Sequence, residues 1–547
     1  RPNSTGYQIA KSLRFRSSAT AYLSRTFGSP TNNIKWTYSC WVKRGNLATD
    51  QSLLEARTDA NNRSGFYIGS GNTLILYDYI GGANVFTAWQ TTAVFRDPSA
   101  WYHIVMVWDT SNSTAANRLQ VYVNGVAQTF SGGAITSSQS SLINSATTHV
   151  IGRFQEASTY FDGYLAEVNF IDGQALTPSS FGTNDATTGV WKPIAYTGTY
   201  GTNGFYLKFA DNSALTTASN VGLGKDSSPN ANYWVTNNIS ITAGTTYDSM
   251  TDTPTPYDNG ANGAGNYCVL NPLVNQASPT LSNGNLYHGA GNGSEAYGTI
   301  AVSTGQWYWE ATAVNSRMSQ GIALVSRVPI NATIYNTHIS SGLYMTDIEN
   351  GLTPKLTANG GAFTAINATT YTIASGTIIN IAFDADNNKL WIGINGTWLS
   401  GNPSTGTSPA ATPSAGTYVP MGAMVSGTGY DEYNINFGQR PFTYTPPSGF
   451  KALNTYNLPT PTIAAGNKYF DATIYSGNSN SSTVISNSGS FQPDFVWIKN
   501  RNNTGGAGVA DHMLYDAVRG VLKELSSNAT TAEGSLATGL SAFNTNG

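Results

Sequence analysis

Short stretches in which apolar and polar residues alternate make up most of the chain, and many of them end at a turn. In "RLQVYVNGVAQTF" (118–130), every second residue from Leu119 to Val123 is apolar, and the run stops at Asn124-Gly125. Alternation with a period of two is typical of a β-strand with one buried face, and Asn-Gly tolerates the positive φ angles of a two-residue hairpin. "NNKLWIGINGTWLSG" (387–401) repeats this pattern. We therefore expect antiparallel strands joined by tight turns.

Other stretches are typical of strands that are buried on both faces. "WYHIVMVWD" (101–109) is apolar at almost every position, as expected of a strand covered on both sides. "TGQWYWEATAV" (304–314) is an aromatic-rich alternating strand. Strand patterns of these kinds fill two long blocks of the chain, which predicts two antiparallel sandwiches.

Two segments that alternate Pro and Thr interrupt these patterns, "TDTPTPYDNGANG" (251–263) and "NLPTPTIAAG" (457–466). Pro biases the preceding residue toward extended backbone, so such segments predict short semi-rigid spacers. The chain is therefore expected to consist of an N-terminal linker at 1–10, a first sandwich at 11–250, a spacer at 251–262, a second sandwich at 263–450, a linker at 451–466 and a small domain at 467–547.

The small domain combines strand patterns with one helical pattern. "KYFDATIYSG" and "FQPDFVWIKN" alternate like strands, whereas "HMLYDAVRGVLKELSSN" (512–528) places an apolar stripe along one face of an α-helix. We interpret the stripe as core packing, with docking of a partner helix as the alternative. The fold class predicted is all-β, with tandem antiparallel β-sandwiches followed by a small mixed α/β domain. Since the chain starts at "RPNST" without Met and stops at "FNTNG", we expect both ends to be incomplete and the small domain to be truncated.

The charge content excludes several classes of function. Charged residues are 10% of the chain, against roughly 25% in an average soluble domain. The net charge is -3 and Lys and Arg form no cluster, so no nucleic acid partner is expected. No apolar run approaches the roughly 18–20 residues of a membrane span, so no membrane insertion is expected. Cys40 and Cys268 are the two cysteines and imply no disulfide framework.

The stretch "FDGYLAEVNFIDGQALTPSSFG" (161–182) is a candidate for a sugar-cleaving strand, because it holds several acidic and amide side chains. Glycoside hydrolysis needs two carboxylates that flank one bond, about 5–5.5 Å apart for retention or about 6.5–9.5 Å apart for inversion. Strict alternation places on one face Tyr164, Ala166, Val168 and Phe170, and on the other Leu165, Glu167, Asn169 and Ile171. Glu167 then has no second acid on its face, and Asp172 points the other way. We interpret the strand as scaffold.

The remaining polar residues form no catalytic or metal-binding pattern. Asp384 and Asp386 precede a hairpin strand, and Asp347 and Glu349 share a face without an accompanying His or Arg. The five histidines are scattered, and the chain has no G-x-S-x-G nucleophile elbow and no phosphate-binding loop. We predict a protein that is not an enzyme, with no catalytic residue, no metal ligand and no cofactor.

Several stretches, taken in order, resemble known modules. "SLRFRSSATAYLSRTF" (12–27), "YSCWVKRG" (38–45), "WYHIVMVWD", "LQVYVNGVAQ" and the stretch at 161–182 closely resemble the concanavalin A-like, laminin G-type jelly roll of bacteriophage tail-fibre and other virion proteins. "GKDSSPNANYWVTNNISI" (224–241) is similar to the end of that module. "GQWYWEATAV", "FDADNNKLWIGINGTW" and "YNINFGQRPF" resemble a SPRY-type sandwich. "FVWIKNRN" and "LYDAVRGVLKEL" are similar to a small domain that follows such modules in phage structural proteins.

This resemblance implies a non-catalytic virion protein of a tailed phage, located on a tail fibre or other surface appendage. Its expected partners are a host-surface glycan or protein receptor and other virion proteins, and fibres are commonly homotrimers. Laminin G-type modules often hold Ca²⁺ near a loop rim, but no acidic cluster in this sequence matches that pattern, so no residue is assigned to it. One alternative is a structural protein that decorates the capsid or tail. The second alternative is a polysaccharide depolymerase.

Two aromatic stretches are the predicted ligand sites of such an adhesin. Uncharged polar and aromatic loops suit sugars, which are bound by hydrogen bonds and ring stacking. "LYDYIGGAN" (76–84) supplies Tyr77, Asp78 and Tyr79, and "SSGLYMTD" (340–347) supplies Tyr344. The competing interpretation of these rings is core packing.

Overall fold

The structure is a computed structural model that describes residues 6–86, 88–155, 159–215, 219–276, 279–289, 294–328, 342–423, 431–477, 483–500 and 511–547. The chain forms two units, Arg1–Thr183 with Lys192–Pro459, and Asn184–Trp191 with Thr460–Gly547. Across the described ranges the regular structure consists of strands and short 3-10 turns, which confirms the predicted all-β class. No helix in these ranges has the length and apolarity needed to cross a membrane.

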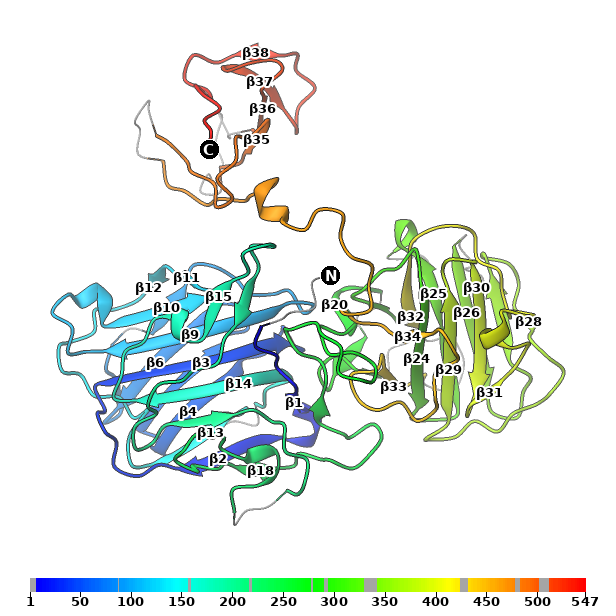
Figure 1. Cartoon of the computed structure of the whole chain (residues 1–547), viewed down its shortest axis with the longest axis horizontal. Helices are drawn as coiled ribbons and strands as arrows, with labels where there is room; N and C mark the ends of the chain where they lie inside the picture. The colour runs from blue at the N-terminus through cyan, green and yellow to red at the C-terminus, as the bar shows by residue number, and fades with distance from the viewer. Residues whose placement is uncertain are drawn as a thin grey trace. The chain divides into compact units, whose positions relative to one another are not determined.

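The first sandwich consists of two antiparallel sheets (Figure 1). The order in the first sheet is β11 (Val126–Ala127), β10 (Leu119–Val123), β9 (Trp101–Asp109), β3 (Lys35–Arg44), β14 (Gly163–Asp172), β1 (Ser12–Phe15) and β19 (Ser249–Met250), with β17 (Phe205–Leu207) also beside β14. The order in the second is β12 (Phe130–Ser131), β8 (Trp89–Thr91), β6 (Leu74–Ile80), β5 (Asn62–Ile68), β4 (Gln51–Asp59), β13 (Thr148–Ile151), β2 (Tyr22–Thr26) and β18 (Val235–Asn237), with β7 (Ala83–Asn84) beside β6. β15 (Gly182–Asn184) and β16 (Trp191–Pro193) pair separately.

Aromatic rings fill the core between these two sheets. The ring centroids of Trp36 and Trp108 are 6.0 Å apart, and those of Trp36 and Phe170 are 5.7 Å apart. These rings come from β3, β9 and β14, which are adjacent in the sheet. Burial of large rings is a major source of stability, and stacking adds to it. The strand at 101–109 is buried on both faces, as its apolar sequence predicts.

The second sandwich repeats this design. One sheet has the order β20 (Leu270–Gln276), β23 (Glu295–Gly298), β32 (Tyr418–Ala423), β25 (Arg317–Leu324), β26 (Leu343–Glu349), β27 (Lys355–Ala358) and β28 (Thr364–Ala365). The other has the order β21 (Thr280–Ser282), β22 (Tyr287–Gly289), β33 (Tyr433–Asn436), β24 (Gln306–Ala313), β29 (Ile378–Asp384), β30 (Lys389–Ile394) and β31 (Thr397–Trp398), with β34 (Lys451–Ala452) beside β24.

Residues 251–262, expected to form a spacer, are instead packed against both sandwiches. Asp252 is completely buried. Its carboxylate accepts a hydrogen bond from Lys43 Nζ of β3 at 2.7 Å, and the same ammonium donates to Asn266 Oδ1 at 2.7 Å and to the carbonyl of Tyr267 at 2.8 Å. Trp101 Nε1 of β9 donates to the other carboxylate oxygen of Asp252 at 2.9 Å. The segment therefore belongs to a buried polar junction.

A second set of contacts strengthens the junction. The buried carboxylate of Asp162 accepts hydrogen bonds from the backbone N–H groups of Asn283 at 2.8 Å and Gly284 at 2.7 Å. Tyr164 donates from its hydroxyl to the carbonyl of Gly284 at 2.8 Å. A Cβ atom at position 284 would lie 2.6 Å from the Tyr164 ring, and φ there is 71°, so glycine is required. These contacts join the two sandwiches into one unit.

The small domain differs from the sequence prediction, because the expected helix at 512–528 is absent from this described segment. Residues 512–528 instead contain two strands, β36 (Met513–Asp516) and β37 (Lys523–Ser526). These strands belong to a sheet with the order β35 (Phe495–Ile498), β36, β37 and β38 (Gly534–Ser535). Asp516 Oδ1 closes the intervening turn by accepting the N–H groups of Val518 at 3.1 Å and Arg519 at 2.8 Å. The prediction of a mixed α/β domain was wrong, and the described part of this domain is a small β domain.

Replacing Gly520 with Ala is expected to lower the free energy of unfolding of this domain by about 1 kcal/mol, because L-residues are strained in left-handed backbone. Gly520 has φ 92°, and an added Cβ meets no atom within 4 Å, so the cost arises from the backbone alone. In a helix the same change would instead raise stability by about 1 kcal/mol. Urea unfolding followed by tryptophan fluorescence gives the sign, and a gain in stability would contradict the hairpin.

Candidate functional site

The outer face of the second sheet of the first sandwich presents rows of polar and aromatic side chains. The strand register places Glu55 of β4, Gly65 of β5 and Tyr77 of β6 opposite one another. In the next row, Arg63 of β5 is opposite Tyr79 of β6. The alternate positions on these strands belong to the core cluster, so both rows point outward.

The ring of Tyr77 is held in place by its neighbours. Its centroid is 5.9 Å from that of Tyr67, which is 5.2 Å from Phe154. A Cβ atom at Gly65 would lie 2.5 Å from the Tyr77 ring, so the ring covers that glycine closely. Tyr77 donates from its hydroxyl to Glu55 Oε1 at 3.0 Å. Burial raises the pKa of both the Tyr77 hydroxyl and the Glu55 carboxyl.

Two arginines stack on the other tyrosines of this face. The Arg63 guanidinium lies 5.0 Å from the ring centroid of Tyr79, and the Arg153 guanidinium lies 4.5 Å from Tyr22 and 6.0 Å from Tyr160. A stacked guanidinium presents N–H donors beside an aromatic surface. We refer to the following half-buried residues as the tyrosine face: Tyr22, Arg63, Tyr67, Tyr77, Tyr79, Arg153 and Tyr160. Such a surface can stack against the apolar face of a sugar and hydrogen-bond to its hydroxyls.

The four ligand residues predicted from the sequence lie in different environments. Tyr77 and Tyr79 belong to the tyrosine face. Asp78 points to the opposite side of β6, is 2% exposed and accepts a hydrogen bond from the Ser64 hydroxyl, and burial raises its pKa to about 8. Tyr344 is 2% exposed and packs against Tyr418, 6.0 Å away between ring centroids. The structure thus brings two of the four together on a surface and places the other two inside.

Sequence reasoning missed the arginine partners of this face. Arg63, Gly65 and Tyr67 occupy alternate positions on β5, and Tyr77 and Tyr79 do so on β6. The alternation indicates which residues share a face, but only the register between β5 and β6 places Arg63 beside Tyr79. No local signal in the sequence therefore identifies Arg63 as the partner of Tyr79.

Within the stretch at 161–182, the faces of β14 differ from those predicted. A β-bulge interrupts β14 between Ala166 and Asn169, and Glu167 has φ 50°. An extra residue in one strand reverses the facing of the residues after it. Val168 and Phe170 consequently share the core with Leu165, and the prediction that they share a face with Tyr164 was wrong.

Glu167 itself lies in a cluster of tyrosines. Tyr7 donates from its hydroxyl to Glu167 Oε2 at 2.7 Å, and the hydroxyl of Tyr206 donates to the same oxygen. Burial raises the pKa of Glu167 to about 7, and the hydrogen bonds from Tyr206 and Tyr7 oppose that rise. These contacts give Glu167 a structural role in holding the segment around Tyr7 against the first sheet.

The other acids of this stretch also make structural contacts. Asp172 Oδ2 accepts the N–H groups of Thr31 at 2.7 Å and Asn203 at 3.0 Å, and Asp162 belongs to the junction between the sandwiches. Within the described part of the chain, no three His, Cys, Asp or Glu side chains gather in a way that could hold a metal ion. No described residue is assigned to the Ca²⁺ that the resemblance implies.

Two segments of the chain match models of known protein families. Residues 17–182 match the concanavalin A-like lectin/glucanases superfamily. The first sandwich has a laminin G-like, concanavalin A-like lectin fold. Residues 465–547 match a domain of unknown function, DUF7483, and no curated protein matches the chain.

Solved structures similar to the chain include three animal proteins. The SAP-like pentraxin of Limulus polyphemus is 19% identical, with 31% of this chain and 80% of the pentraxin covered and a TM-score of 0.23. Domains LG4-5 of the mouse laminin alpha1 chain are 9% identical, with coverages of 79% and 87% and a TM-score of 0.27. The SPRY domain of human HERC1 is 18% identical, with coverages of 30% and 96% and a TM-score of 0.22.

Proposed function

We propose that this chain is a carbohydrate-binding protein whose lectin-like sandwich holds glycan on the tyrosine face. The observation that carries the proposal is the set of outward-facing tyrosines with Arg63 and Arg153 stacked on them. Tyrosine offers a large, rigid contact area at low cost in conformational entropy, and it keeps a polar hydroxyl at its edge. The match of residues 17–182 to a superfamily of lectins and glucanases supports a sugar as the ligand.

The proposed setting is a non-catalytic adhesin on the tail fibre or another surface appendage of a tailed phage, assembled as a homotrimer. Its support is the ordered sequence resemblance to phage virion modules. A ligand displayed repeatedly on a host surface suits such an assembly, since several weak sites acting together raise the overall affinity. The alternatives are a role in decorating the capsid or tail and a role as a polysaccharide depolymerase.

Replacing Tyr79 with Ala, or Arg63 with Ala, is expected to weaken glycan binding about tenfold or more, because central aromatic and arginine contacts dominate binding energy. The measurement is binding of the full chain to an array of neutral and acidic bacterial glycans, followed by titration of the best ligand. Tyr371→Ala, which removes a half-buried tyrosine of the second sandwich, is the matched control and should bind like the parent protein.

Three outcomes would contradict the proposal. Binding of the parent protein to purified capsids or tails but to no glycan would favour the decorating role. Shortening of the bound polysaccharide during incubation would favour the depolymerase. Retention of full glycan affinity by both variants would remove the tyrosine face as the site while leaving carbohydrate binding itself intact.

A further inference from the structure

A small hollow in the second sandwich offers a set of polar groups that differs from the tyrosine face. It has a volume of about 270 Å³, and its lining includes Gln306, Trp307, Asp386, Lys451, Asn457 and Pro459. Pockets for drug-sized ligands are roughly 300–1,000 Å³, so this hollow matches a smaller ligand. One sugar ring is of suitable size, whereas an extended oligosaccharide or a folded peptide is not.

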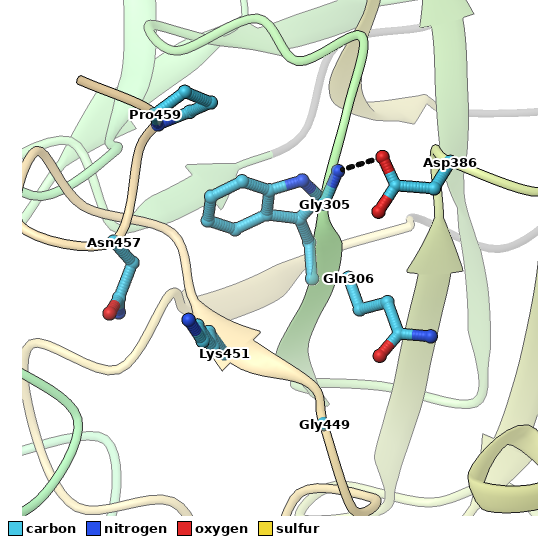
Figure 2. A pocket seen from close by; sticks show the side chains of 8 residues that line it. Gly305, Gln306, Asp386, Gly449, Lys451, Asn457 and Pro459 are labelled. Atoms are coloured by element: carbon cyan, nitrogen blue, oxygen red, sulfur yellow. Dashed lines mark hydrogen bonds between the residues drawn. The ribbon is translucent and has the colours of Figure 1, made fainter.

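Three separate segments build this hollow, and the sheet fixes their positions. β34 runs parallel to β24 and places Lys451 opposite Trp307. Asp386 comes from the turn after β29, which pairs with β24 on its other side. Figure 2 shows Asp386 on one side of the hollow and Lys451, Asn457 and Pro459 on the other.

The carboxylate of Asp386 is oriented by the backbone. Gly305 donates its N–H to Asp386 Oδ1 at 2.8 Å, as Figure 2 shows. No hydrogen bond from another described residue reaches the second carboxylate oxygen, and Asp386 is exposed. The side chain therefore presents a fixed charged acceptor to a ligand, and charged acceptors form the stronger hydrogen bonds to hydroxyl groups.

Asn457 supplies a second fixed acceptor. Its Nδ2 donates to the carbonyls of Asn262 at 3.0 Å and Ala452 at 2.8 Å, which sets the orientation of the amide. Its Oδ1 accepts no hydrogen bond from the part of the chain that the structure describes. An acceptor held in place by its own donors costs little entropy when a ligand binds.

Lys451 supplies the donor, and Pro459 supplies apolar surface above the buried Trp307. Lys451 is exposed, and its ammonium has no acceptor among the described residues. Trp307 is 2% exposed, and Thr304 accepts a hydrogen bond from its indole Nε1 at 2.8 Å, so its ring is a rigid support beneath the hollow, and the exposed Pro459 is the apolar wall that a ligand can reach. Two acceptors, one ammonium donor and an apolar wall match a ring with neighbouring hydroxyls, since each hydroxyl both donates and accepts.

We infer that this hollow is a second carbohydrate site, which takes a single sugar ring and acts independently of the tyrosine face. The sugar hydroxyls would donate to Asp386 and Asn457 and accept from Lys451, with one face of the ring against the apolar wall. A terminal sugar of a branched glycan, or a free monosaccharide, meets these requirements.

The test uses the full chain and a panel of free monosaccharides: glucose, galactose, mannose, rhamnose, N-acetylglucosamine and N-acetylgalactosamine. Saturation-transfer NMR followed by titration should identify at least one that binds with a Kd near the millimolar range, a weak affinity typical of a few hydrogen bonds. Asp386→Ala and Lys451→Met are each expected to weaken that binding about tenfold or more.

The control variants separate this site from the tyrosine face and from unfolding. Asp386→Asn keeps an acceptor for Gly305 while removing the charge, so it should fold like the parent protein and still bind more weakly. Lys355→Met, which removes a half-buried lysine of β27, should leave monosaccharide binding unchanged, whereas Tyr79→Ala should weaken glycan binding without abolishing the saturable monosaccharide site. Failure of every monosaccharide to bind saturably below about 10 mM would overturn the inference. Binding that persists unchanged in Asp386→Ala and Lys451→Met would also overturn it, whatever happens at the tyrosine face.

Discussion

Replacing Lys43 with Met is expected to lower the free energy of unfolding of the two-sandwich unit by about 3–5 kcal/mol, because it leaves a buried charge without its partner. Both side chains of the Lys43–Asp252 pair are completely buried, and Lys43 Nζ is 2.7 Å from Asp252 Oδ2. Burial raises the pKa of Asp252 even with the lysine present. Guanidinium unfolding followed by tryptophan fluorescence measures the loss.

Two comparisons make this prediction specific. Lys225→Met breaks a pair in which the lysine side chain is 44% exposed and 3.5 Å from Asp211, so the expected loss is below about 1 kcal/mol. Adding Asp252→Asn to Lys43→Met should recover part of the loss, because the unpaired charge is removed. Equal losses of unfolding free energy in Lys43→Met and Lys225→Met would show that the buried Lys43–Asp252 pair contributes no more stability than an exposed pair.

Replacing Asp78 with Asn is expected to stabilise the protein increasingly as the pH rises from about 4 to about 8, because a buried carboxyl resists ionisation. Burial raises the pKa of Asp78 to about 8 in the folded chain. In the unfolded chain its pKa is near 4, so between these values the unfolded state binds fewer protons and the stability of the parent protein falls with rising pH. The variant lacks this titration, and its advantage should grow by roughly 5 kcal/mol across the range.

The measurement is the free energy of unfolding of both proteins at four or five pH values between 4 and 9. The comparison with the parent protein cancels the other titrating groups, including His103, His149 and His288, whose pKa values burial lowers. Asp59→Asn, at an exposed hairpin, is the control and should gain no stability with rising pH, since hydrogen bonds lower the pKa of Asp59. A pH-independent difference for Asp78→Asn would show that the carboxyl ionises normally.

Local patterns in the sequence correctly predicted the Asn-Gly hairpin turns of the two sandwiches. Asn124-Gly125 and Asn395-Gly396 have the positive φ angles predicted, with φ 50° and 81° at the first turn and 46° and 79° at the second. The same local reading failed at 512–528, where Leu514 and Leu525 both fit a helical stripe. In the structure these two leucines are paired across a hairpin. Apolar spacing alone could not distinguish a helix from a hairpin, because the hairpin turn depends on the side chain of Asp516 and on the positive φ of Gly520.

Features that depend on distant parts of the chain were beyond sequence reasoning. Lys43 and Asp252 are 209 residues apart, and nothing near either residue indicates the pair. The bulge at Glu167 arises from pairing with β3, so strict alternation along β14 could not reveal it. The tyrosine face was predicted in part, since Tyr77 and Tyr79 are local, whereas its arginines required the strand register.

The buried junction also fixes the separation of two surfaces on the same unit. If a flexible linker joined the two sandwiches, the tyrosine face and the hollow of the second sandwich would move independently. A ligand that contacts both surfaces would then lose binding free energy, because binding would have to fix the two sandwiches relative to each other. The polar contacts of Asp162 and Lys43 already fix the two sandwiches relative to each other before a ligand binds, so this entropy cost does not arise on binding. If both proposed sites hold sugar, a branched polysaccharide whose repeat length equals this constant spacing would be selected over one of the same sugars with a different repeat.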